Sequence, residues 1–405
     1  MDVSAPCPAA RPCETAANDA RMPRALVALF AVASGVSVAN VYYAQPLLDA
    51  FAADFGIARA AVGGVVTATQ LGCALALLLL VPLGDRVDRR RLIGAQCVAL
   101  VAALAAVAGA RSVPLLLAAM LGVGLLGTAM TQGLIACAAS AAAPDERGRV
   151  VGAAQGGVFV GLLLARVVSG ALGDLVGWRG VYAASALVML ALAWPLARRL
   201  PATLPTARRS YAQLLASMLA LLREERVLRV RGLLALLMFA ALNVFWSALV
   251  LPLSAPPFGF SHTAIGAFGL AGAAGALAAS RAGQWADRGF AGRTSALALA
   301  LLTLAWAPLA LLHWSLGALL VGIVLLDVGA QLLHVTNQSL IFRARSDAPS
   351  RLIGAYMLFY AAGSGLGAIA TTATYARAGW TGVCLLGAAI SAAASGFWWT
   401  TRERG

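Results

Sequence analysis

Long apolar blocks separated by short polar or charged connections run through the whole chain. Each block holds about 20 residues, the length that an α-helix needs to cross the hydrocarbon core of a bilayer. Short segments of alternating apolar and polar residues, which a membrane-spanning β-barrel needs, do not occur. Because a spanning helix satisfies its own backbone hydrogen bonds, the pattern predicts an all-α, polytopic membrane protein.

Arginine, proline, glycine and polar breaks mark the ends of twelve predicted membrane spans. These cover residues 25–46, 60–83, 92–110, 114–137, 150–172, 179–197, 230–252, 263–283, 294–312, 316–341, 352–373 and 379–399. The longest connection separates the sixth and seventh spans. Within it, apolar residues from Tyr211 to Leu222 recur at helical spacing, which predicts an amphipathic helix on the membrane surface.

The composition fits this picture, with 61% hydrophobic and 11% charged residues. All 30 basic residues are arginines, and 25 of them fall in the two terminal tails and in alternate connections. The other connections hold only Arg59, Arg111, Arg179 and Arg377. Since cytoplasmic loops carry the excess of basic residues, both termini are expected in the cytoplasm, with the chain in a plasma membrane of bacterial inner-membrane type.

Several classes of function are not supported by the sequence. The net charge of +14 is spread over alternate loops and forms no continuous basic face with aromatic residues, so nucleic acid is not an expected partner. The six cysteines are scattered, and no disulfide, metal site or cofactor is expected. A phosphate-binding loop and the common hydrolase motifs are absent, so the chain is not expected to be an enzyme.

The chain also contains an internal repeat. A shift of 202 residues aligns Asp85-Arg86 with Asp287-Arg288, and Gly177-Trp178 with Gly379-Trp380. We therefore expect two six-helix halves in parallel repeat, with a site between them near the membrane midplane. The expected domains are a disordered cytoplasmic tail (1–23), the first half (24–198), a central cytoplasmic loop with the amphipathic helix (199–228), the second half (229–400) and a cytoplasmic tail (401–405).

The connection "VPLGDRVDRR" between the second and third spans carries a family signature. It resembles the loop of major facilitator superfamily transporters, and the resemblance extends over essentially all of the chain from about residue 24. It implies the twelve-helix fold of that family and a gate on the cytoplasmic side. The gating candidates are Asp85, Arg86, Arg89 and Arg90, with Asp145 and Glu146 as partners for Arg86, and Asp287 and Arg288 in the second copy. The alternative is that these arginines only set the topology.

Two charged residues lie inside predicted spans, away from the ends: Arg166 in the fifth and Asp327 in the tenth. A charge in this position needs a partner or an aqueous cavity, and the two residues differ by only about 5–6 Å in height, so they are predicted to pair across the halves. His334 lies two turns after Asp327, and both are candidates for proton coupling. Alternatively, Asp327 only neutralises Arg166, and His334 only joins helices.

In the resembled family the first, fourth, seventh and tenth spans line the cavity. The resemblance, together with polar residues on neighbouring spans, gives these substrate-lining candidates: Asn40, Tyr43, Gln70, Gln132, Gln155, Arg166, Asn243, Trp246, Gln331, Asn337 and Gln338. For Tyr42 and Tyr43 the alternative is anchoring at the membrane interface.

The sequence therefore predicts a monomeric secondary transporter that moves a small organic solute by alternating access. Proton-coupled efflux is expected from the resemblance to bacterial drug and sugar efflux members. Proton-coupled uptake of an organic anion is the alternative, because Arg166 provides a counter-charge. A membrane receptor without transport is a third possibility.

Overall fold

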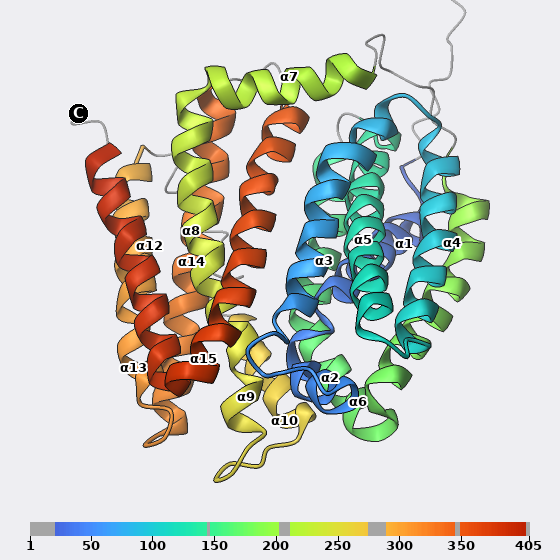
Figure 1. The fold of residues 1–405 in the computed structure, drawn as a ribbon. Helices are drawn as coiled ribbons and strands as arrows, with labels where there is room; N and C mark the ends of the chain where they lie inside the picture. The colour runs from blue at the N-terminus through green and yellow to red at the C-terminus, as the bar shows by residue number, and fades with distance from the viewer. Residues whose placement is uncertain (1–20, 144–145, 202–210, 274–288, 345–348, 402–405) are drawn as a thin grey trace, which may run out of the picture.

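The computed structural model describes residues 21–143, 146–201, 211–273, 289–344 and 349–401. The predicted N-terminal tail lies almost entirely outside this part of the chain. The described residues contain helices and no strand, which confirms the all-α prediction. The helices form two bundles side by side, and α7 (Tyr211–Glu224) lies across one end of them (Figure 1).

The N-terminal bundle contains the elements up to α6. They are α1 (Arg24–Tyr42), η1 (Gln45–Leu47), α2 (Leu48–Phe55), α3 (Gly64–Leu75), η2 (Ala76–Leu80), η3 (Pro82–Asp85), α4 (Arg89–Ala108), α5 (Val113–Ala141) and α6 (Arg147–Arg199). α1 packs against α5 and α6, while α4 packs against the same two helices from another side. Fully buried Phe30, Phe51 and Tyr182 lie in the core of this bundle.

The C-terminal bundle begins after α7. It contains α8 (Arg226–Ala248), α9 (Val250–Leu253), α10 (His262–Ala267), η4 (Phe268–Gly272), α12 (Ala291–Leu304), α13 (Trp306–Ala310), α14 (Leu316–Ala344) and α15 (Pro349–Thr401). α8 packs against α14 and most extensively against α15, and α12 packs against α14.

The helices agree with the predicted spans. Nine helical segments in the described part of the chain are long and apolar enough to cross a membrane. Two of these, in α6 and α15, each match two predicted spans, because Gly177 (φ 70°) and Gly379 (φ 59°) break the helix between them. Only glycine adopts such a φ at little cost. The eighth predicted span, 263–283, is described only as far as residue 273.

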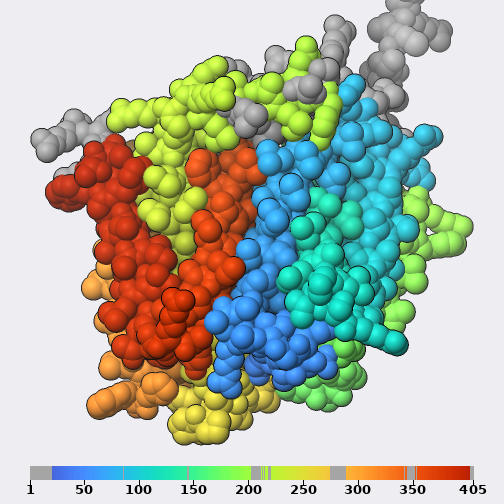
Figure 2. Space-filling view, in the orientation of Figure 1, coloured from blue at the N-terminus to red at the C-terminus, as the bar shows by residue number. Residues whose placement is uncertain are grey.

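The two bundles meet mainly at the end away from α7. There α3 packs against α15, and α10 packs against α6. The hydroxyl of Thr67 on α3 donates to the carbonyl of Gly365 on α15 at 2.8 Å, and that of Thr372 donates to the carbonyl of Ala60 at 3.1 Å. The space-filling view shows α3 in blue and α15 in orange-red meeting along a continuous seam (Figure 2).

Close approach of the helices depends on particular glycines. A Cβ placed on Gly266 of α10 would lie 2.2 Å from the carbonyl oxygen of Arg166, so this glycine lets α10 approach α6. On α6, Gly157 and Gly161 face α1 of the same bundle, where an added Cβ would lie 2.0 and 2.2 Å from backbone oxygens. A different glycine of α6, Gly170, faces α10 of the other bundle.

Candidate functional site

A cluster of polar and aromatic side chains joins the N-terminal bundle to the C-terminal bundle. Arg166 reaches it from α6, Trp246 from α8 and Asp327 from α14. We call the following residues the central cluster: Tyr42, Gln45, Arg166, Asn243, Trp246, Asp327 and Tyr360.

Trp246 lies between the two intramembrane charges. The guanidinium carbon of Arg166 is 4.0 Å from the centroid of the Trp246 ring, which is cation–π geometry. On its edge the indole Nε1–H donates to Oδ1 of Asp327 at 3.4 Å. Among the described residues no direct ion pair joins Arg166 to Asp327. The two charges predicted to pair thus approach each other from the two halves, and the Trp246 ring lies between them in place of a direct ion pair.

Gln45 continues the cluster on the other side of Arg166. Its Oε1 accepts from Nε of Arg166 at 2.9 Å, and its Nε2 donates to Oδ1 of Asn243 at 3.2 Å. The chain Asn243–Gln45–Arg166–Trp246–Asp327 therefore crosses between the bundles twice, from Asn243 to Gln45 and from Arg166 to Trp246. A relative movement of the bundles has to break it.

Two tyrosines make a second bridge. The hydroxyls of Tyr42 on α1 and Tyr360 on α15 are hydrogen-bonded, and Gln70 on α3 also interacts with Tyr360. The ring of Tyr42 lies 5.7 Å from the Arg166 guanidinium carbon. Sequence reasoning does not find Tyr360, because no polar periodicity surrounds it in α15.

The central cluster is tightly packed. The cavity beside Gln45, Arg166 and Trp246 has a volume of only about 10 Å³, which is room for roughly one water molecule. A larger solute therefore needs the two bundles to separate here.

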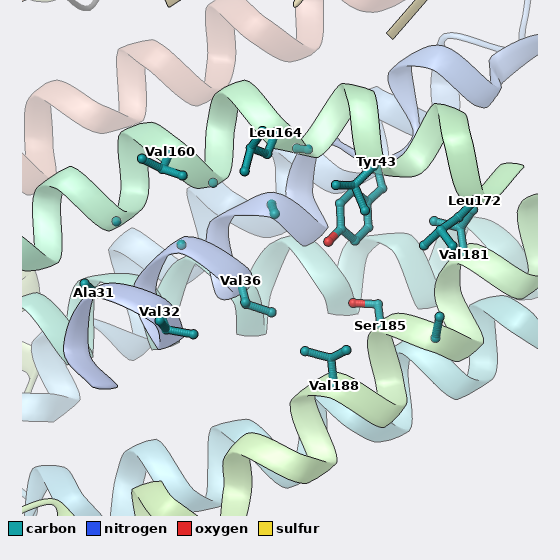
Figure 3. A pocket seen from close by; sticks show the side chains of 17 residues that line it. Ala31, Val32, Val36, Tyr43, Val160, Leu164, Leu172, Val181, Ser185 and Val188 are labelled. Carbon is teal, nitrogen blue, oxygen red and sulfur yellow. The ribbon is translucent and has the colours of Figure 1, made fainter. Parts of the chain in front are cut away.

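Tyr43 does not face the cluster. It lines an apolar cavity of about 570 Å³ between α1 and the two arms of α6, with Ser185 beside it (Figure 3). Several lining residues are exposed on the outer surface of the bundle, among them Val32, Val160 and Val188. The expectation that Tyr43 lines the central path is corrected: consecutive residues on a helix point about 100° apart, and Tyr42 is the one that faces the centre.

Asn40 is likewise engaged within its own bundle. Its Oδ1 accepts from the hydroxyl of Ser185, and its Nδ2 donates to the carbonyl of Val36 at 2.8 Å. Gln155 is exposed on α6, and Gln132 on α5 is half-buried. Neither is hydrogen-bonded to the central cluster in the described part of the chain. The structure thus brings together only some of the predicted lining residues.

Most of the polar side chains after Asp327 on α14 contact other residues of the C-terminal bundle. His334 Nδ1 lies 3.0 Å from the hydroxyl of Tyr356, and Nε2 of Gln338 lies 3.3 Å from His334 Nε2. This pattern fits a neutral imidazole that donates from Nδ1 and accepts at Nε2. Between Asp327 and His334, the Oε1 atom of Gln331 is buried without a hydrogen-bond partner in the described residues.

Asn337 also interacts with Tyr356, and it contacts a partly buried arginine. Its Oδ1 lies 3.5 Å from Nη1 of Arg231 on α8, and the same nitrogen donates to the hydroxyl of Ser295 at 3.1 Å. The His334 and Asn337 groups both join helices inside the C-terminal bundle. Their contacts favour the helix-joining interpretation of these residues.

Of the gating candidates, those in the described connection from η3 to α4 lie near α7. Arg89 donates to the carbonyls of Gly84 and Ala136 at 3.1 and 3.2 Å, and Arg90 donates to the carbonyl of Ala197. Both arginines therefore hold the loop against α5 and α6. Asp145, Asp287, Arg288 and the side chain of Asp85 lie outside the described residues.

Glu146 is engaged within the N-terminal bundle. Its carboxylate accepts from the backbone N–H of Met22 at 2.8 Å and from Arg149 at 2.5 Å. These two donors hold the pKa of Glu146 below its usual range. The expected partner Arg86 is exposed and is not bound to Glu146.

Comparison with known proteins identifies the family. The family model described as "Major Facilitator Superfamily" matches residues 28–347. The chain is 41% identical, over 377 residues, to "Uncharacterized transporter YgaY" of Escherichia coli O157:H7, covering 93% of this chain and 95% of that relative. It is 32% identical, over 374 residues, to "Probable transporter SCO4007" of Streptomyces coelicolor, covering 90% and 85%.

Solved structures share the fold at low identity. The nucleoside transporter NupG superposes with a TM-score of 0.74 at 13% identity, covering 93% of this chain and all of that one. A bacterial homologue of the human lysosomal transporter Spinster, in an inward-facing and unoccupied conformation, gives 0.71 at 15% identity, covering 94% and 98%. The chain therefore belongs to the major facilitator superfamily and is a multi-pass membrane transporter, not an enzyme.

Proposed function

We propose that this transporter exports a small organic solute by alternating access and that the export is driven by protons. The observation that carries the proposal is the contact of Trp246 with both Arg166 and Asp327. It places a titratable carboxylate in a chain of contacts that links the two bundles. A proton on Asp327 and the arrangement of the bundles are therefore coupled.

The physical link runs through the charge on Asp327. An ionised carboxylate accepts the Trp246 N–H bond strongly, and its negative charge also stabilises the nearby guanidinium of Arg166. Protonation removes that charge and weakens both interactions. Since Arg166 belongs to the other bundle, a protonated Asp327 makes separation of the bundles easier.

One observation favours a second function, uptake of an organic anion. Arg166 is held by Gln45 and by an aromatic ring rather than by a direct carboxylate partner. A solute carboxylate that entered between the bundles could bind this guanidinium through two hydrogen bonds. The export direction itself rests on the resemblance to efflux members of the family.

The test is accumulation of labelled solutes, cationic and anionic, in cells that express the wild type or the Asp327→Asn variant, with and without a protonophore. We expect the wild type to lower the accumulation of at least one solute in a protonophore-sensitive manner. Asp327→Asn is expected to abolish this effect, because the amide cannot exchange a proton. Asp327→Glu should retain part of it.

Asp54→Asn is the matched control, because Asp54 pairs with Arg179 outside the central cluster and its loss should leave coupling intact. Membrane levels of all variants are measured in parallel. Raised accumulation of an anion by the wild type would contradict export and support uptake. Wild-type flux in Asp327→Asn would contradict the coupling role.

A further inference from the structure

Three ionisable side chains meet at the end of the molecule away from α7. Asp49 lies in the first turn of α2, Asp174 lies on α6 just before the break at Gly177, and His262 is the first residue of α10. All three belong to predicted connections between spans. Both acids come from the N-terminal bundle, and the histidine comes from the C-terminal bundle.

The imidazole of His262 lies between the two carboxylates. Its Nδ1 is 2.9 Å from Oδ1 of Asp174, and its Nε2 is 3.0 Å from Oδ1 of Asp49. A neutral imidazole has one N–H, so one ring nitrogen would point its lone pair at a carboxylate oxygen. Only the imidazolium donates to both acids, and the geometry therefore fits a protonated ring.

The backbone holds the ring in this position. Oδ1 of Asp174 also accepts from the backbone N–H of His262 at 3.0 Å, and Oδ2 accepts from the N–H and the hydroxyl of Thr263 at 2.8 and 2.6 Å. One turn earlier on α6, Gly170 lets the helix approach closely: an added Cβ would lie 2.2 Å from the carbonyl oxygen of His262. Asp174 therefore fixes the start of α10. In this position the Nε2 atom of the His262 ring can contact Asp49.

The neighbouring charges have partners of their own. Asp54, the other acid of α2, is bound to Arg179 and to the indole N–H of Trp178. Arg166, on the face of α6 that packs against α10, turns to Gln45 and Trp246. η1 and α9, which also contact this region, carry no titratable side chain. Among the described residues, His262 is thus the cation that faces Asp49 and Asp174.

We propose that His262 is a proton-operated latch, whose protonated ring clamps the C-terminal bundle to Asp49 and Asp174 of the N-terminal bundle and whose deprotonation releases this side for opening. The proposal rests on the alternating access of the proposed function. It adds a second proton site, separate from Asp327, that controls which side of the transporter is open.

The direction of the pH effect follows from the two states of the ring. In the closed arrangement the hydrogen bond to Asp49, together with the charges of both acids, outweighs partial burial and raises the pKa of His262 to about 9 from 6.5. Separation of the bundles removes both acids and returns the pKa toward 6.5. The latch is therefore fully formed below about pH 6.5 and is lost as the pH rises through about 9. Over that range the ratio of closed to open molecules should fall on the order of a hundredfold.

The experiment measures the opening directly, without a solute. Spin labels are placed at exposed Ala53 on α2 and exposed Trp314 between α13 and α14, in a background without other reactive cysteines. Double electron–electron resonance then gives the distance distribution between the bundles in lipid nanodiscs, from about pH 5.5 to about pH 10, a range that brackets both pKa values. In the wild type we expect a short-distance population that is replaced by a longer one as the pH rises.

Two substitutions of His262 should act in opposite directions. His262→Gln cannot carry the charge, so it is expected to show the longer distance at every pH. His262→Arg keeps the charge, so it is expected to show the short distance at every pH. His313→Gln, an exposed histidine on the same side, should keep the wild-type response.

Wild-type pH dependence in His262→Gln, or none in the wild type, would overturn the latch. Because no solute is used, either result is independent of the solute assay. Asp327 acts in the opposite direction, since its protonation at low pH makes separation of the bundles easier, whereas His262 releases them at high pH. Failure of proton-coupled export is recognised separately, from the protonophore experiment.

Discussion

At the scale of single residues, Trp246 has two separable functions in the central cluster. Its ring face contacts the Arg166 guanidinium, and its ring edge donates to Asp327. A cation–π contact is worth about 0.5–2 kcal/mol, and a hydrogen bond to a charged group is worth about 1.5–3 kcal/mol. The two contributions are of similar size, so substitutions have to remove them one at a time.

Trp246→Phe keeps an aromatic face and removes the N–H. We expect this variant to lose about 1.5–3 kcal/mol of stability and its proton-coupled flux to fall about 10- to 100-fold, since the lost bond involves the carboxylate proposed to carry the proton. Trp246→Leu removes both contacts and should reduce stability further. Flux and the midpoint of thermal unfolding are measured on the same preparations. Trp194→Phe, an exposed tryptophan of α6, serves as the control. Unchanged flux in Trp246→Phe would show that the N–H bond takes no part in coupling.

At the scale of elements, neighbouring glycines of α6 have unequal effects on helix packing. An added Cβ on Gly157 would lie 2.0 Å from the carbonyl oxygen of Ala31 on α1, whereas an added Cβ on Gly156 meets nothing within 4 Å. Backbone cannot move aside as a flexible side chain can, so the first substitution forces α1 and α6 apart.

Gly157→Ala should therefore destabilise the protein by about 1–3 kcal/mol and lower its unfolding midpoint in detergent. Gly156→Ala should leave the midpoint unchanged or raise it slightly, because alanine is the better helix former. Differential scanning fluorimetry on the two variants gives the comparison. Equal midpoints would mean that α1 and α6 are not in close contact at Gly157.

Much of the arrangement of the helices can be predicted from the sequence. Apolar block length and the 202-residue repeat predicted the helices and the paired breaks at Gly177 and Gly379. Height in the membrane predicted that Arg166 and Asp327 would approach each other. The apolar pattern does not show which face of a helix points to the centre, so the sequence predicts Tyr43 as a lining residue where Tyr42 faces the cluster. Asp49 and His262 are 213 positions apart in two connections, and no periodicity relates them.

At the scale of the whole molecule, the proposed cycle requires the two bundles to separate where α3 meets α15. Thr67 and Gly365 provide a position to test this requirement. The Thr67 hydroxyl donates to the Gly365 carbonyl at 2.8 Å, and a Cβ on Gly365 would lie 3.7 Å from Cγ2 and 3.9 Å from Cα of Thr67. The Cβ of Thr67 is bonded to both of these atoms, so the two Cβ atoms lie near the distance of about 3.5–4.5 Å that a disulfide needs.

The double variant Thr67→Cys with Gly365→Cys is therefore expected to form a disulfide on mild oxidation and to lose transport. A reductant should restore transport, while each single variant should transport under both conditions. The readout is solute flux, alongside the fraction of crosslinked protein from a protease cut in the α7 connection. Loss with recovery would mean that α3 and α15 move apart in every cycle. Undiminished flux in fully crosslinked protein would mean that solute passes without separation of this contact. Rocking of the two bundles about the central cluster would then be wrong, and a local movement of fewer helices would have to replace it.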